Sequence, residues 1–283
     1  MTLPTFLGIG VPRAGTTWLH KLLESHPKVY VPPQRKEVHF FDRYYDRGMQ
    51  WYESFFPAEA RSCQYQAIGE ITPGYLYCAQ CAERIASISS VTKLILMLRN
   101  PVDRAYSHYR FRMRVDGYSG LFEDFLDSYP HAVEWGFYSR GLKNYLRHFN
   151  RAQFLVLIYE QSFTDKNETK DQLAQFLGVD PRLFPETSVE RKVNRSYMPK
   201  LRLIYALATR TARYLREKDL YRIINLAKAL GVREVFGEDR RSIPPMKEET
   251  RRYLESLYSE EITELESLIR VDLSCWKQSV ETA

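Results

Sequence analysis

The chain has 283 residues, of which 44% are hydrophobic, so it can bury a full core but is short for two large domains. Lys and Arg number 41 against 35 for Asp and Glu, which gives a formal charge of +6 and favours anionic ligands. The basic residues are scattered among acidic ones, which argues against a surface that binds nucleic acid. We therefore expect a single domain over residues 1–283 that binds an anion other than nucleic acid.

No segment approaches the roughly 20 consecutive apolar residues that a membrane-spanning helix needs. Met1 leads almost directly into a core-like strand rather than a secretory signal, so we expect a cytoplasmic protein with no transmembrane segment. Cys78 and Cys81 form a CxxC pair, but the chain has no second such pair and no histidine at zinc-binding spacing. These features predict reduced thiols and no bound metal.

The first two predicted units each consist of a strand followed by a helix. Residues 5–10 are apolar and end in glycine, and residues 18–24 then repeat Trp and Leu at helical spacing. Residues 92–98 are too apolar for a surface helix and suit a strand covered on both faces. Asn100 is an N-cap residue and Pro101 suits the first helical position, so a helix should begin there.

A third unit and a terminal helix follow. Residues 154–159 form a further apolar run, and the helix after it should end at Leu177 because Gly178 follows. Repeated strand–helix units predict an α/β fold with a central parallel sheet flanked by helices. Residues 197–240 are basic and rich in Tyr and Leu, which predicts a helical cap or insertion, and residues 247–269 are amphipathic and predict a terminal helix.

A glycine loop joins the first strand to the first helix. Residues 10–17 read GVPRAGTT, with the glycine spacing of a P-loop, at a place where backbone N–H groups and the helix dipole form an anion site. A nucleoside-triphosphate site carries lysine directly after the second glycine, but this chain has Thr16 there and carries its cation within the loop, as Arg13. A P-loop kinase or nucleotidase is therefore an alternative, and a purely structural turn is another.

Two ordered motifs carry a resemblance to a known family. Residues 12–19, PRAGTTWL, resemble the 5′-phosphosulfate loop of the sulfotransferases that use 3′-phosphoadenosine 5′-phosphosulfate (PAPS). Residues 99–107, RNPVDRAYS, resemble the 3′-phosphate segment of that family. KEVHFFD at 36–42 and EITPGY at 70–75 are similar to the heparan-sulfate branch and related bacterial enzymes. The resemblance implies a P-loop-like sulfotransferase fold and transfer of a sulfuryl group from PAPS to an acceptor hydroxyl or amine.

The resemblance also implies a set of residues that bind PAPS. Arg99 offers a bidentate fork to a phosphate, and Ser107 adds a hydroxyl from the following helix. Arg195, in a basic loop that resembles the one folding over the 3′-phosphate, is a third contact. The alternatives are helix capping or a surface pair for the first two residues, and a solvated basic loop for the third. The full expected set is Arg13, Ala14, Gly15, Thr16, Thr17, Trp18, Arg99, Ser107 and Arg195.

Three residues are implied in catalysis. Glu37 matches the catalytic glutamate of the heparan-sulfate branch and would act as the base, while His39 and Asp42 match polar residues beside the acceptor. Arg13 would stabilise charge on the leaving oxygen, since arginine cannot act as an acid. On the residues alone, Glu37 could simply pair with a neighbouring cation, and His39 could be a core histidine.

Several points stay open at this stage. His108 adjoins Ser107 and is a rival base, because other sulfotransferase branches use histidine. Ile71 and Thr17 stand where the heparan-sulfate branch carries lysine and arginine, which argues against heparan sulfate as the acceptor. Small-molecule, lipid, glycan and carrier-bound acceptors all fit. A non-catalytic protein that binds anions or glycans is a further alternative.

Overall fold

The computed structural model describes residues 2–58, 63–186 and 243–277, together with 198–199, 207–208, 210–212, 214–215 and 238–239. The chain divides into two compact units. The first contains Met1–Arg104, Trp135–Val193 and Glu255–Ala283, and the second contains Ala105–Glu134 and Asn194–Leu254. The predicted insertion at 197–240 lies almost entirely outside the described residues.

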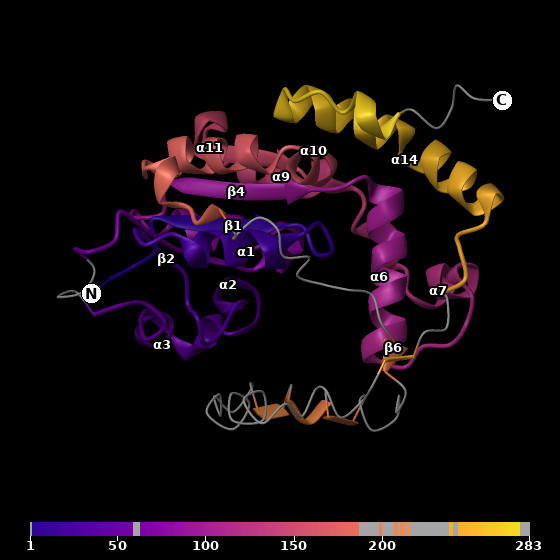
Figure 1. Ribbon diagram of the computed structural model, residues 1–283, viewed down its shortest axis with the longest axis horizontal. Coiled ribbons are helices and arrows are strands. Elements are labelled where there is room, and N and C mark those ends of the chain that lie inside the picture. Colours follow the sequence, from indigo (N-terminus) through magenta and orange to yellow (C-terminus); the bar gives the residue numbers. More distant parts are fainter. Residues whose placement is uncertain are drawn as a thin grey trace. The chain divides into compact units, whose positions relative to one another are not determined.

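The first unit is built on a five-stranded parallel sheet in the order β2-β3-β1-β4-β5, flanked by helices (Figure 1). Strands β1 and β3 are buried at every residue, as expected for strands in the middle of a parallel sheet. The fold class and the three predicted strands are confirmed, whereas β2 and β3 were not predicted. The strands are β1 (Phe6–Gly10), β2 (Val29–Tyr30), β3 (Ala67–Ile71), β4 (Lys93–Leu98) and β5 (Phe154–Ile158).

The helices of the first unit follow the expected start and stop signals. Asp165 caps α11 by accepting a hydrogen bond from the Glu168 amide at 2.9 Å, and Gly178 ends this helix with φ of 77°. The predicted end at Leu177 is therefore confirmed. The helices are α1 (Thr16–Ser25), α2 (Phe40–Arg43), α3 (Met49–Glu53), α5 (Cys81–Ala86), α9 (Tyr138–Leu146), α10 (Tyr159–Thr164) and α11 (Lys166–Leu177), with 3₁₀ turns at Tyr45–Arg47, Pro73–Tyr77, Arg151–Gln153, Pro181–Leu183 and Ser274–Trp276.

Two longer helices have residues in both units. Helix α6 (Pro101–Val115) begins as predicted, because Asn100 Oδ1 accepts the Val102 amide at 3.0 Å. Helix α14 (Glu248–Ile269) matches the predicted terminal helix. No described helix is long and apolar enough to cross a membrane. The second unit also contains α7 (Phe122–Ser128), α8 (His131–Glu134) and the antiparallel pair β6 (Met198–Pro199) and β7 (Glu238–Asp239).

The CxxC pair corrects one expectation. Cys78 and Cys81 are joined by a disulfide, so the prediction of reduced thiols is wrong for this pair. The Cys81 amide donates to the Cys78 carbonyl at 3.3 Å, and this tight turn holds the two Cα atoms 5.3 Å apart, within disulfide range. Cys63 and Cys275 are exposed.

Candidate active site

The phosphate loop, residues 10–18, leaves the end of β1 and enters α1. Gly15 is the N-cap of α1 with φ of 89°, and a Cβ there would approach a ring carbon of Tyr159 to 2.9 Å, so both the backbone conformation and the packing require glycine. Neither a capping side chain nor an acidic residue occupies the first turn of this ten-residue helix. The positive end of the helix dipole is therefore available to an anion.

Arg99 follows β4, the sheet neighbour of β1, and its guanidinium reaches the phosphate loop. It donates from Nη1 to the Arg13 carbonyl at 3.3 Å and lies over the Tyr159 ring, 4.4 Å from the centroid. The Tyr138 hydroxyl donates to the Arg99 carbonyl at 2.8 Å, so that tyrosine supports the end of β4. The two motifs recognised separately in the sequence thus meet in space, as parallel strands ending at one sheet edge dictate.

Two other predicted residues, Ser107 and His108, belong to the second unit. Ser107 lies on α6 in the second unit, half-buried. His108 is buried in that unit, where its ring packs edge-on against Phe125 and its Nε2 lies 3.4 Å from Arg112 Nε. Arg195 lies outside the described residues.

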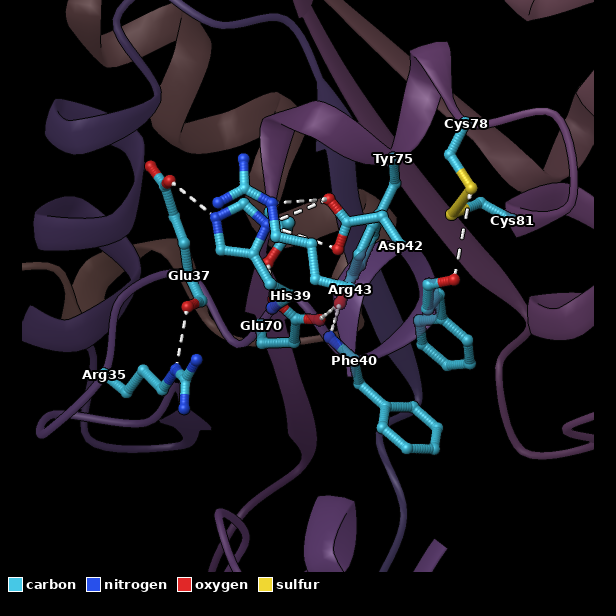
Figure 2. Close-up of polar contacts among 12 residues, drawn as sticks. Arg35, Glu37, His39, Phe40, Asp42, Arg43, Glu70, Tyr75, Cys78 and Cys81 are labelled. Atoms are coloured by element: carbon cyan, nitrogen blue, oxygen red, sulfur yellow. Dashed lines mark hydrogen bonds and ion pairs between the residues drawn. A yellow bond between two sulfur atoms is a disulfide. The ribbon is translucent and has the colours of Figure 1, made fainter. Parts of the chain in front are cut away.

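Glu37, His39 and Asp42 form a carboxylate–histidine cluster around the start of α2. Figure 2 shows the imidazole of His39 between the two carboxylates. His39 Nε2 lies 3.4 Å from Glu37 Oε2, and His39 Nδ1 lies 2.9 Å from Asp42 Oδ2. His39 is the N-cap of α2, so Asp42, three residues later, returns beside it. His39 is therefore held by polar partners rather than by an apolar core.

Contacts within the cluster and with Lys36 shift the pKa values of Glu37 and His39. Burial opposes the charged form of Glu37, but the Lys36 charge and the hydrogen bonds from His39 and Lys36 outweigh it and hold the pKa of Glu37 well below its usual value. Burial alone would lower the pKa of His39, but hydrogen bonds to Asp42 and Glu37 raise the pKa above the usual histidine value. An ionised Glu37 thus lies beside an imidazole whose protonated form is favoured.

Lys36 links the cluster to the phosphate loop. Its Nζ lies 2.8 Å from Glu37 Oε1 and donates to Thr16 Oγ1 at 3.4 Å. Pairing of Glu37 with a neighbouring cation, the alternative that the residues alone offered, is present as the ion pair with Lys36. The contact with Thr16 was missed, because no local pattern relates positions twenty residues apart. Lys36 therefore adds a second cation between the loop and the base candidate.

The segment at the end of β3 contributes buried polar groups that the sequence assigned no role. Glu70 is completely buried and accepts hydrogen bonds from the Thr72 and Tyr75 hydroxyls, each at 2.7 Å. Ile71 is also completely buried, and its side chain packs on Gly8, where a Cβ would come within 2.8 Å of it. Among the residues the structure describes, no group of three or more His, Cys, Asp or Glu side chains is arranged to hold a metal ion.

Comparison with known proteins identifies the family. The family model for the sulfotransferase domain matches residues 3–262, so the chain belongs to the sulfotransferase domain family. This match confirms the family that the two motifs indicated.

Individual relatives refine this placement. Human heparan sulfate glucosamine 3-O-sulfotransferase 3B1 is 33% identical over 186 residues, which cover 62% of this chain and 46% of that protein. Human bifunctional heparan sulfate N-deacetylase/N-sulfotransferase 3 is 27% identical over 287 residues, covering 94% of this chain and 30% of that protein. The chain thus spans less than half the length of these curated relatives. A sulfotransferase from Alicyclobacillus acidocaldarius has the same fold, with a TM-score of 0.71 at 24% identity over 98% of this chain and 100% of that one.

Proposed function

We propose that the chain transfers the sulfuryl group of PAPS to a hydroxyl or amine of a glycan, releasing adenosine 3′,5′-bisphosphate (PAP). The observation that carries this proposal is the contact between Arg99 and the Arg13 carbonyl, since it joins the two phosphate-binding motifs at neighbouring strand ends. The family match supports sulfuryl transfer over the kinase alternative. The relatives named for heparan sulfate favour a glycan acceptor over lipid, carrier-bound or other small acceptors.

The donor would lie along the phosphate loop. The amides at the start of α1 and the side chains of Thr16 and Thr17 face the sulfated 5′-phosphate in this proposal, and Arg99 binds the 3′-phosphate. Ala14, Gly15 and Trp18 shape the loop. Ser107 and Arg195 stay predicted donor contacts.

In the transfer step, the acceptor oxygen or nitrogen forms a bond to sulfur as the bond from sulfur to the bridging oxygen breaks. The electron pair of the broken bond goes to the 5′-phosphate of PAP, and the acceptor proton goes to the Glu37 carboxylate. Arg13 and Lys36 stabilise the charge that develops on the leaving and transferred oxygens.

The low pKa of Glu37 fits this role once the donor is bound. Lys36 is the strongest attraction that holds the Glu37 pKa down. The negative charges of PAPS, placed beside Thr16, compete for Lys36 and raise the pKa of Glu37 towards the range of an effective base. His39 and Asp42 keep the carboxylate oriented meanwhile.

The test is transfer from ³⁵S-labelled PAPS to a panel containing heparan sulfate, N-desulfated heparan sulfate, a hydroxylated lipid and a simple phenol. We expect label on one of the two glycans, together with equimolar PAP. Binding of ATP with magnesium but not PAPS would favour the kinase alternative. Binding of PAPS with no labelled acceptor would favour a non-catalytic anion-binding protein. Cytoplasmic location and independence of metal stay predictions.

A further inference from the structure

Another carboxylate, that of Glu70, has no part in the proposed chemistry and lies close to the segment that carries Glu37. Glu70 on β3 is fully buried, and so are its two partners Thr72 and Tyr75. Thr72 Oγ1 donates to Glu70 Oε2 and Tyr75 OH donates to Glu70 Oε1, both at 2.7 Å (Figure 2 shows Glu70 and Tyr75). Both carboxylate oxygens of Glu70 are thereby satisfied inside the protein, away from water.

The same two hydroxyls also accept hydrogen bonds from the backbone beside the cluster. The His39 amide donates to Thr72 Oγ1 at 3.3 Å, and the Phe40 amide donates to Tyr75 OH at 2.9 Å. A hydroxyl has one proton, and an amide N–H cannot accept it, so the proton of each hydroxyl must point to Glu70. The carboxylate therefore sets the direction of both chains of hydrogen bonds.

The backbone at His39 is in a conformation that its surroundings must stabilise. His39 has φ of 58°, in the left-handed region, which is unfavourable for a residue with a side chain. Such a conformation persists only where the surroundings hold it. The hydrogen bonds that the His39 and Phe40 amides donate stabilise this conformation. The His39 ring can then reach Glu37 and Asp42 together.

We infer that Glu70 is a positioning residue for sulfuryl transfer: through Thr72 and Tyr75 it fixes the backbone at His39, and so orients the imidazole that holds the base Glu37. This inference rests on the proposed function, in which Glu37 takes the acceptor proton. Glu70 touches neither donor nor acceptor in this assignment, and acts only through other side chains.

The inference includes a pH dependence, because the network is complete only with an ionised carboxylate. Burial raises the pKa of Glu70 to about 7, against the lowering effect of the hydrogen bonds from Thr72 and Tyr75. A protonated Glu70 would need an acceptor of its own, and one hydroxyl would have to turn away. The positioning is therefore complete above about pH 7. The titratable side chains that face Glu70 from neighbouring elements are His39, Asp42, Tyr52, Tyr75 and Tyr145.

The test compares Glu70→Gln and Tyr75→Phe with Glu261→Gln. Glu70→Gln places an NH₂ group where one hydroxyl requires an acceptor. Tyr75→Phe removes the hydroxyl that accepts the Phe40 amide, without changing any charge. Glu261 is the matched control, because it is a buried glutamate that accepts the Ser139 amide and hydroxyl, both at 2.7 Å, in another part of the first unit.

Three readouts are measured for each variant. Turnover of ³⁵S-labelled PAPS with whichever of heparan sulfate and N-desulfated heparan sulfate accepts the label gives kcat and its pH profile, and calorimetry gives the dissociation constant for PAP. NMR of protein labelled with ¹³C at histidine Cε1, with the His39 signal assigned by His39→Gln, follows the titration of His39 without any acceptor. We expect Glu70→Gln and Tyr75→Phe to lower kcat about 10-fold, the scale of one lost buried hydrogen bond, with PAP binding unchanged. Both should displace the His39 titration, and Glu70→Gln should also remove the rise of kcat near pH 7.

Glu261→Gln should lower the melting temperature and leave kcat and the His39 titration unchanged. Wild-type kcat and an unmoved His39 signal in Glu70→Gln and Tyr75→Phe would overturn the inference, as would equal losses in the Glu261 control. If the wild type binds no PAP and labels no acceptor, the proposed function fails, and the His39 titration still decides whether Glu70 positions this histidine.

Discussion

The phosphate loop with Arg99 and the carboxylate–histidine cluster lie in the same unit but are built on different principles. The loop presents backbone amides and guanidinium groups, whose charge does not change at ordinary pH. The cluster is built from two carboxylates and an imidazole whose contacts lower the pKa of Glu37 and raise the pKa of His39, beside a buried Glu70 whose pKa is about 7. Donor binding should therefore be nearly independent of pH, whereas catalysis should depend on it.

Glu37→Gln separates the two regions most sharply. The amide keeps the volume of the side chain but cannot accept the acceptor proton, so kcat should fall by about 10² to 10⁴ while PAP affinity changes little. Initial rates with labelled PAPS and calorimetry with PAP measure the two effects. Glu24→Gln, which removes a surface partner of Lys21, is the control. Near-wild-type kcat in Glu37→Gln, with inactive His39→Ala or His108→Ala, would move the base to a histidine.

The contribution of Glu70 to the free energy of unfolding should depend on pH in a defined direction. The Glu70 pKa is about 7 in the folded protein and near 4.5 in the unfolded chain, so the folded state binds more protons between these values. Its contribution to the free energy of unfolding is thus fully present below pH 4.5 and is lost as pH rises through 7. The change is ~3 kcal/mol, from about 1.4 kcal/mol per pKa unit.

Urea unfolding at pH 5 and pH 8 measures this effect. The wild type should lose ~3 kcal/mol more than Glu70→Gln over that interval. His39, whose pKa is also raised, contributes a loss in the same direction, so the His39 titration of each protein, followed by NMR, enters the comparison. Equal pH dependence in both proteins would show that Glu70 does not titrate in this range.

Arg99→Ala addresses the donor side. Loss of a charge-assisted phosphate contact should weaken PAP binding by roughly 2 to 3 kcal/mol, about 30- to 150-fold, at every pH from 6 to 9. Arg151→Ala is the control, because Arg151 donates to the Ile269 and Phe154 carbonyls and should affect stability only. Unchanged PAP affinity in Arg99→Ala would remove this arginine from the donor site.

Chelation should have the smallest effect of all. Because the phosphate loop carries its own cation, Arg13, we expect full turnover in EDTA, measured with labelled PAPS after dialysis. Loss of turnover that magnesium alone restores would favour the kinase-like alternative and would undo the contrast between a cationic donor side and a titrating acceptor side.

Local sequence patterns predicted most of the parallel sheet but not all of it. Strands β1, β4 and β5 are apolar runs and were predictable, as was the cap at Asn100. Strand β2 has only two residues, and β3 has a glycine and Glu70 in its buried stretch, so neither reads as an apolar run. A buried glutamate is tolerated there because Thr72 and Tyr75 satisfy it, and this compensation cannot be seen in the strand itself.

The sequence by itself determined the phosphate loop and Arg99 as candidate site residues, because loop glycines, strand ends and caps depend on neighbours in the chain, whereas Glu37 was implied only by the resemblance to the sulfotransferase family. Only the tertiary structure decided that Lys36 bridges Thr16 and Glu37 and that Glu70 supports His39 from thirty-one positions away. The physical reason is that hydrogen bonds and ion pairs act over a few ångströms in space, whereas residue spacing in a sequence reports only the contacts that one helix, strand or turn can make.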